Sequence, residues 1–194
     1  MRIVAVTLSL AFLAACAHAP APAPPPVAKV AVLPVGNRTG APLLVTGGSV
    51  IERYALGTPR VTVPDLLQFE AESFLRARGV QVVEPGALAA VKSERLSDLV
   101  AALAADRFDG AALRLDVWRW EPDADTHPAF VIVGLDATLI DVASGRTLWQ
   151  WRRPLRPVPT PGAVTLGIAD QVAVRSAVAE VLDAWKTMRS PAGE

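Results

Sequence analysis

The sequence predicts a single α/β (α+β) domain with a mixed sheet and helices packed on it. Three observations support this prediction. In the first half of the chain, short apolar runs of strand length alternate with helical patterns, as in parallel crossover units. Three alternating strands then follow one another between residues 111 and 153, which is typical of an antiparallel meander. A final amphipathic helix completes the order β-α-β-α-β-β-β-α.

Residues 1–15 have the features of a secretory signal peptide. Arg2 supplies a positive charge, the stretch from Ile3 to Leu13 is apolar, and small residues stand directly before Cys16. The run Leu-Ala-Ala-Cys resembles the bacterial lipobox, which implies that the signal is cut before Cys16 and that this cysteine carries acyl chains. The alternative is an ordinary cleaved signal in which Cys16 is an incidental small residue.

Residues 16–27 form the lipidated cysteine and an alanine- and proline-rich tether. The run AHAPAPAPPP cannot form a helix and favours extended polyproline II. At about 3.1 Å per residue, it holds the following domain on the order of 30 Å from the bilayer. We expect one folded domain over residues 28–189 and a frayed tail at residues 190–194.

Charge and cysteine content exclude several classes of protein. Cys16 is the single cysteine, so the chain cannot form an internal disulfide. Lysine plus arginine and aspartate plus glutamate number 19 each, and this balance argues against a nucleic-acid partner. No apolar run after Cys16 reaches the roughly 18 residues of a transmembrane helix. We therefore expect contact with the membrane through acyl chains alone, of which stable anchoring needs two or more.

The domain begins with a predicted central strand over residues 29–35, KVAVLPV. Turn-forming residues follow from Asn37 to Gly40. A turn in which Asn37 and Thr39 cap their own backbone is the simpler interpretation, and a phosphate or carboxylate nest around Asn37 and Arg38 is the alternative. Residues 41–60 lack clean periodicity and predict a long loop, with or without a short hairpin at residues 43–50. Long loops are often functional, so this loop is a candidate specificity element.

Two crossover helices with a strand between them are predicted next. Thr62 and Asp65 fit a capping box, and Gly79 ends the first helix in a left-handed conformation. The apolar face of this helix consists of Leu67, Ala71, Phe74 and Leu75, and the residues placed off it are Glu70, Glu72, Arg76 and Arg78. A strand follows at residues 80–84. The second helix is expected over residues 87–107, with a break near Ser93.

The second half of the chain predicts a meander and a last helix. Its strands are expected at residues 111–120, 129–142 and 146–153, joined by a polar loop and by a tight turn at Ser144-Gly145. Residues 155–162 contain three prolines and predict a linker or arm. Residues 163–188 regain helical spacing, with a wide apolar stripe that includes Trp185 and Met188.

Four of the five tryptophans occur in pairs on these strands. Because alternate residues of a strand point to the same face, Trp118 and Trp120 are expected to share a face, as are Trp149 and Trp151. Packing between the sheet and the helices is the simpler interpretation. The alternative is an exposed aromatic strip, containing Trp120 or Trp151, that binds a protein or glycan, since tryptophan is enriched at interface hot spots.

No catalytic constellation is visible in the sequence. The only histidines are His18, in the tether, and His127, so a nucleophile with an adjacent base is not indicated. Asp123, Asp125 and His127 could hold a metal, but a solvated hairpin tip is the simpler interpretation because no further His or Cys completes a closed site. Phosphate-binding glycine motifs are absent from the sequence. We expect no cofactor, no metal and no enzymatic activity.

Two stretches resemble a known group of proteins. The runs VAVLPVGNRTG and LDATLIDVASGRTLWQW are similar to periplasmic lipoproteins that share the domain of the curli-secretion protein CsgG, the penicillin-binding-protein activator LpoB and the TolB N-terminal domain. The resemblance implies an outer-membrane lipoprotein that faces the periplasm. Ala17 fits this location, since the usual signal for inner-membrane retention is an Asp directly after the cysteine.

Two functions follow as leading expectations. The first is a non-enzymatic adaptor or accessory lipoprotein that binds an envelope partner in assembly, synthesis or secretion. The second is a self-assembling ring or pore subunit of the CsgG type, and a homo-oligomer is therefore among the expected partners. Strands 129–142 and 145–153 approach the length of a membrane-inserted hairpin. However, Gly134 and Asp136 in the first and the pair Arg152-Arg153 in the second leave neither face evenly apolar. A remote third alternative is an envelope glycan hydrolase that uses unassigned carboxylates.

Overall fold

The computed structural model describes residues 25–45, 61–84 and 86–183. The signal peptide, Cys16, most of the tether, residues 46–60 of the expected loop, Trp185, Met188 and the tail lie outside the described residues. The described elements, in chain order, are β1 (Lys29–Val32), β2 (Gly36–Asn37), α2 (Val63–Ala77), β3 (Gln81–Val83), α3 (Gly86–Ala89), α4 (Leu96–Ala105), β4 (Ala111–Pro122), β5 (Phe130–Asp141), β6 (Thr147–Arg152), β7 (Arg156–Pro159) and α5 (Leu166–Leu182).

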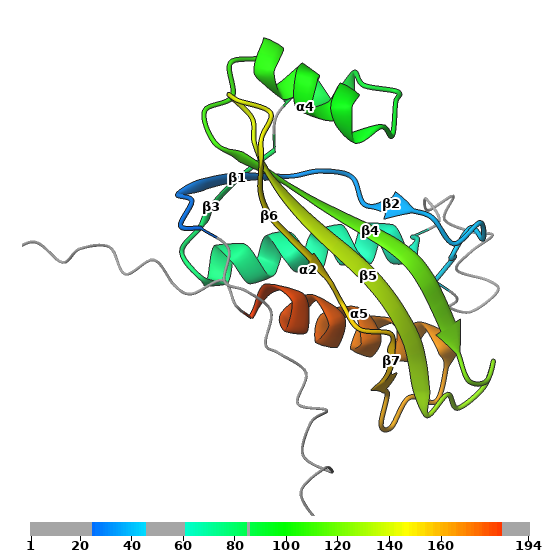
Figure 1. Ribbon diagram of the computed structural model, residues 1–194. Coiled ribbons are helices and arrows are strands. Elements are labelled where there is room, and N and C mark those ends of the chain that lie inside the picture. Colours follow the sequence, from blue (N-terminus) through cyan, green and yellow to red (C-terminus); the bar gives the residue numbers. More distant parts are fainter. Residues whose placement is uncertain (1–24, 46–60, 85, 184–194) are drawn as a thin grey trace, which may run out of the picture.

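All seven strands belong to one mixed sheet, shown in Figure 1. Its order is β3-β1-β4-β5-β6, with β2 added to β4 and β7 added to β5. β1 is parallel to both of its neighbours, whereas β4, β5 and β6 pair in antiparallel fashion. The predicted α+β class, with a mixed sheet and a meander, is confirmed. β1 is an interior strand, as expected, although β4 is the middle strand of the five.

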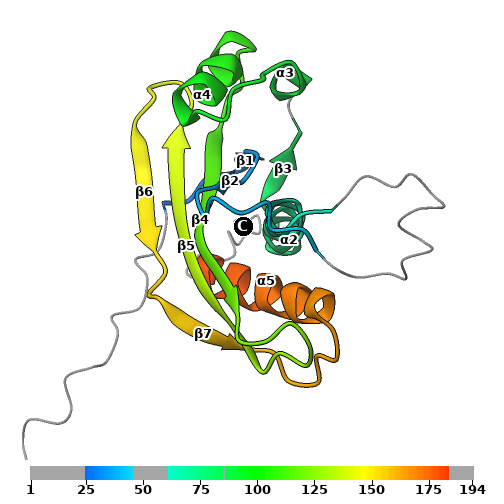
Figure 2. The same cartoon turned by 90° about the vertical axis from the view of Figure 1, so that its right-hand side faces the viewer.

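Helices α2 and α5 lie side by side across one face of the sheet (Figure 2). Thr62 caps α2, and its hydroxyl and backbone N–H form the predicted capping box with Asp65. At the other end Gly79 has φ +79°, as the left-handed C-terminus requires. Arg78 and Asp183 form a 3.0 Å ion pair beyond the C-terminal ends of α2 and α5, so the two helices are parallel.

The main core lies between this helix pair and the sheet. Alternate residues of β4 and β5 supply its sheet side, and fully buried side chains of α2 and α5 supply the other. Its central members are Val30, Leu67, Leu75, Leu113, Leu115, Val133, Leu135, Leu139, Val174 and Val178. Glu72, which was expected off the apolar face of α2, is buried outside the main core, and its carboxylate accepts hydrogen bonds from Gln68 and Arg76.

Arg153 fastens the β6–β7 junction to α5. It is 1% exposed and donates to the Val133 carbonyl at 2.7 Å and to the Glu180 carboxylate at 3.0 Å. Desolvation lowers the pKa of this guanidinium, and the charge of Glu180 opposes that shift. A buried arginine that meets both carbonyl and carboxylate acceptors is therefore a fixed structural element.

The other face of the sheet is covered only at one end. There α3 and α4 shield a smaller core of Ala31, Leu33, Leu99, Leu103, Phe108, Ala112 and Val142. Over the rest of β4, β5 and β6 no described helix lies on this face (Figure 2). We call this uncovered area the open face.

Several expected boundaries are wrong. Residues 155–162 are not a linker, because β7 pairs with β5 there, at an edge position where proline is tolerated. The strand expected at residues 29–35 ends at Val32, and the chain resumes pairing as β2. The second crossover helix is two helices separated near Ser93, as the predicted break indicated. The described start of the 41–60 loop, residues 41–45, pairs with residues 61–63, through a bridge between Leu44 and Thr62 and a hydrogen bond from the Val45 N–H to the Val61 carbonyl.

Candidate functional site

The open face carries two aspartates that lie opposite each other. Asp116 of β4 and Asp136 of β5 are paired residues in the antiparallel ladder. Residues at paired positions have side chains close enough to interact, and like charges there are destabilising. Both aspartates are less than 8% exposed. Each carboxylate therefore needs its own donors.

Two arginines neutralise Asp116. Arg114 donates from Nε at 3.1 Å, and Arg38 donates from Nη2 at 2.7 Å. Arg114 is itself buried and also donates to the carbonyl oxygens of Pro34 and Glu94. Gly36 leaves space for this arrangement, since a Cβ there would collide with the Asp116 carboxylate.

Asp136 has a second, separate set of donors. Its carboxylate accepts from Trp118 Nε1 at 3.0 Å and from Nε and Nη2 of Arg152 at 2.9 and 2.7 Å. The same guanidinium lies 5.7 Å from the Trp118 ring centroid. Below the ring is Gly134, where a Cβ would stand 2.6 Å from the indole. The hydrogen bond to Asp136 and its charge raise the pKa of Arg152.

These groups form one row across the sheet, made of Arg38, Asp116, Asp136 and Arg152, with Arg114 and Trp118 beside it. The carboxylates are buried, whereas the side chains of Arg38 and Arg152 are 61% and 72% exposed. The row thus presents guanidinium groups to solvent. Sequence reasoning missed it, although the polar alternation of the two strands would have revealed it once their register was known.

Trp120 lies on the face opposite Trp118, so their expected shared face is wrong. A β-bulge between Val117 and Arg119 shifts the ladder by one residue. Trp120 is consequently 8% exposed in the main core, where its indole N–H donates to Asp170 at 2.9 Å. The proposed role of Trp120 in an exposed aromatic strip is wrong for this reason.

The second tryptophan pair is arranged as predicted. Trp149 and Trp151 pair with Leu139 and Ala137, so both face the helix side of the sheet. Trp149 is buried, and Trp151 is half-buried against the core. Packing therefore accounts for both side chains.

The segment around Asn37 is a self-capped turn. The Asn37 side-chain oxygen accepts from the Thr39 backbone N–H at 3.1 Å, and its amide donates to the Ala41 carbonyl at 2.6 Å. Arg38 leaves this turn to reach Asp116. Of the residues chosen from sequence for partner binding, Arg38 alone belongs to the row on the open face.

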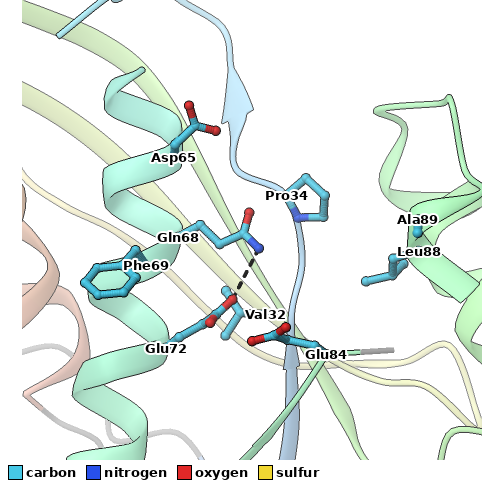
Figure 3. Close-up of a pocket in the computed structure, with 9 residues that line it drawn as sticks. All are labelled: Val32, Pro34, Asp65, Gln68, Phe69, Glu72, Glu84, Leu88 and Ala89. Carbon is cyan, nitrogen blue, oxygen red and sulfur yellow. Dashed lines mark hydrogen bonds between the residues drawn. The ribbon is translucent and has the colours of Figure 1, made fainter. Parts of the chain in front are cut away.

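A second feature is an acidic pocket of about 500 Å³ at the β3 edge of the sheet. Figure 3 shows Gln68 and Glu72 of α2 and Glu84 beyond β3 pointing into the space between α2 and β1. Asp65, Phe69 and Leu88 also line it. Arg76 bridges Glu72 and Glu84 at 3.0 and 3.2 Å, so of the three carboxylates that the described residues place around the pocket, those of Asp65, Glu72 and Glu84, two pair with this one guanidinium. Phe69 is 65% exposed.

The hairpin-tip residues show no metal geometry. Asp123 Oδ1 accepts from the backbone N–H groups of Ala129 and Phe130, at 2.9 and 3.2 Å, and so caps the β4–β5 loop. Among the described residues no three His, Cys, Asp or Glu side chains are placed to hold a metal ion. In the described part of the chain, no helix has the length and apolar character needed to cross a membrane.

Comparison with solved structures identifies the fold. No protein-family model matches the sequence, and no match is found among curated proteins. The PelC dodecamer from Paraburkholderia phytofirmans has a TM-score of 0.53 at 18% identity, over 88% of this chain and 96% of PelC. Lipoprotein GNA1162 from Neisseria meningitidis gives 0.40 at 16%, over 66% and 80%. The LpoB C-terminal domain from Salmonella enterica gives 0.39 at 11%, over 74% and 87%. At such identities the PelC likeness shows the fold alone.

Proposed function

We propose that this protein is a lipid-anchored, non-enzymatic accessory protein of the bacterial envelope that acts by binding protein. The observation that carries the proposal is the open face. A sheet face that is covered at one end only, with an ordered row of charged side chains and a partly exposed tryptophan, is a surface suited to contact with another macromolecule.

The chemistry of the row supports a binding role over catalysis. Both carboxylates are buried and accept hydrogen bonds from arginine or indole donors, so they hold those side chains in place on the face. The nearest described histidine, His127, belongs to the β4–β5 loop. Arginine and tryptophan are the residue types most enriched at protein interfaces.

The N-terminal sequence supports the location. Lipidation at Cys16 and a tether of roughly 30 Å would place the domain in the periplasm, at the outer membrane. From that position it can reach a partner in the same membrane or a short distance into the periplasm.

A homo-oligomeric ring is the second candidate. The solved PelC structures are dodecamers, and the PelC fold extends over nearly all of the described domain. The apolar sides of β5 and β6 pack against α2 and α5, which favours a ring of folded domains over a hairpin inserted into the membrane.

Cross-linking in living cells, followed by affinity capture, tests this function. The native chain is compared with a Cys16→Ser form that is exported by a substituted signal. Capture of one envelope protein or of further copies of the chain, dependent on Cys16, supports an anchored accessory protein. Equal capture by both forms would show that binding does not need the lipid anchor. If both forms yield only the monomeric protein and no cross-linked product, the binding function is contradicted.

A further inference from the structure

We propose that the open face binds the acidic pocket of a second copy of this chain, with Arg152 and Arg38 of one copy facing Glu84 and Asp65 of the next. This inference rests on the homo-oligomer proposed above and specifies its interface. The occupant of the open face is thus the β3 edge of a neighbouring subunit.

The cationic side of this contact is preorganised. Asp136 and the Trp118 ring hold Arg152 in place, yet its side chain stays 72% exposed. Arg38 donates one hydrogen bond, from Nη2 to the Asp116 carboxylate, and its side chain is 61% exposed. A guanidinium has five N–H donors, so each arginine has donors left for a second acceptor. Because these hydrogen bonds already order the guanidinium groups, less side-chain entropy is lost on binding.

The acidic side offers complementary charge and space. Among the described residues the pocket contains three carboxylates, and the guanidinium of Arg76 pairs with two of them. Glu84 is 77% exposed at its mouth, and Asp65 is an exposed residue of the first turn of α2. A volume of about 500 Å³ is enough to admit a side chain from outside. Phe69 at the rim adds apolar surface that binding would cover.

The positions of the two surfaces determine the kind of assembly. The row runs from Arg38, just after β2, across β4 and β5 to Arg152 on β6, whereas the pocket lies between α2 and β1 near the end of β3, and the two surfaces share no residue. A contact between two different surfaces is heterologous, and repeating it generates a ring where the rotation closes. Each subunit then binds one neighbour through its open face and the other neighbour through its acidic pocket.

The electrostatics predict how the assembly responds to salt. Single exposed ion pairs contribute little to affinity, but they set register and exclude wrong partners. Because the side chains of Arg38, Arg152 and Glu84 are largely exposed, salt screens their charges. We expect subunits to associate more weakly as ionic strength rises.

Charge reversal with mixing tests the interface. The mature acylated protein in detergent is weighed by native mass spectrometry, as wild type and as the Glu84→Arg and Arg152→Glu variants. Each variant alone should lose about ten-fold or more in association, since each places like charges together. An equimolar mixture should reassemble, because alternating subunits restore every opposite-charge contact. Arg175→Glu, at an exposed position on α5, is the matched control and should assemble like wild type.

The outcomes separate this interface from the broader proposal. A wild-type protein that is monomeric at all concentrations contradicts the homo-oligomer itself. A wild-type oligomer that neither reversal weakens, or variants whose mixture fails to reassemble, overturn the interface but leave the oligomer. If Arg152→Glu disturbs the fold through Asp136, then Arg152→Gln, which keeps an N–H donor for that carboxylate, takes its place. It should also assemble more weakly than wild type.

Discussion

Asp116 and Asp136 face each other across the β4–β5 ladder, and each has a separate set of donors. Two carboxylates at paired positions would repel each other. The arrangement is stable because Arg114 and Arg38 neutralise one, while Arg152 and the Trp118 indole satisfy the other. The same compensation that stabilises the strand pair places two guanidinium groups on the surface. The residues that stabilise the strand pair are thus the same residues that we propose for binding.

The first prediction concerns the buried pair of Arg114 and Asp116. Replacing Asp116 with Ala leaves the Arg114 guanidinium, which is 6% exposed, without its counter-charge. We expect a loss of about 3–5 kcal/mol in the free energy of unfolding, measured by urea denaturation. Glu121→Ala is the control, because it breaks the exposed Arg119–Glu121 pair and should cost far less stability than Asp116→Ala. Equal losses for the two variants would contradict the burial of the pair.

The second prediction concerns Gly134 and Trp118. Gly134→Ala puts a methyl group where the indole lies, so the ring must move and its bond to Asp136 is lost. We expect a cost on the order of 1–3 kcal/mol and a change in tryptophan fluorescence. In a Trp118→Ala background the same Gly134→Ala change should cost much less, because the clash is gone. Additive costs would show that the ring does not lie on Gly134.

These residues also show where the sequence is informative and where it is not. Alternation located the long strands, and the capping box and Gly79 located α2. The bulge at Val117–Arg119 has no such sequence signal, and it places Trp118 and Trp120 on opposite faces of the sheet. Pro157 and Pro159 indicate a linker, yet at a sheet edge their missing N–H groups cost nothing.

The arginine row was hidden for a related reason. Asp116 and Asp136 are twenty residues apart, and only the register of the ladder shows that they are partners. Arg38 and Arg152 approach them from outside β4 and β5. The local sequence pattern identifies a polar position in a strand, but it does not identify the distant residue that forms a hydrogen bond or ion pair with it.

The third prediction tests the packing role of Trp120. Trp120→Ala should cost about 3–5 kcal/mol, because it removes a large buried side chain and the donor to Asp170. Trp151→Ala should cost less, since that side chain is half-buried. Thermal and urea unfolding of both variants provide the comparison. A Trp120→Ala protein as stable as wild type would contradict the placement of this side chain in the core.

The fourth prediction follows from Asp170. Burial raises the pKa of its carboxyl group, and the hydrogen bond from Trp120 only partly opposes this shift. The folded state therefore binds the proton more tightly than the unfolded chain, so ionisation of Asp170 costs stability as pH rises through the raised pKa. Asp170→Asn keeps an oxygen for the indole and removes the charge.

The Asp170→Asn variant should be more stable than wild type at pH 7, and the difference should shrink as the pH falls below the raised pKa. Melting temperatures of both proteins from pH 4 to pH 8 measure this. If the difference in melting temperature is constant with pH, or grows in acid, then burial does not raise the pKa of the Asp170 carboxyl group.

Site-specific photo-cross-linking in cells tests whether the open face is the binding surface. A photoreactive residue replaces Gln150, an exposed residue of β6 that pairs with Thr138 on the open face. A second strain carries it at Arg175 on α5, which is also exposed. We expect discrete cross-linked products, to another copy or to one envelope protein, from Gln150 and far less product from Arg175. No product from Gln150, or the same products from both positions, would contradict the open face as the binding surface.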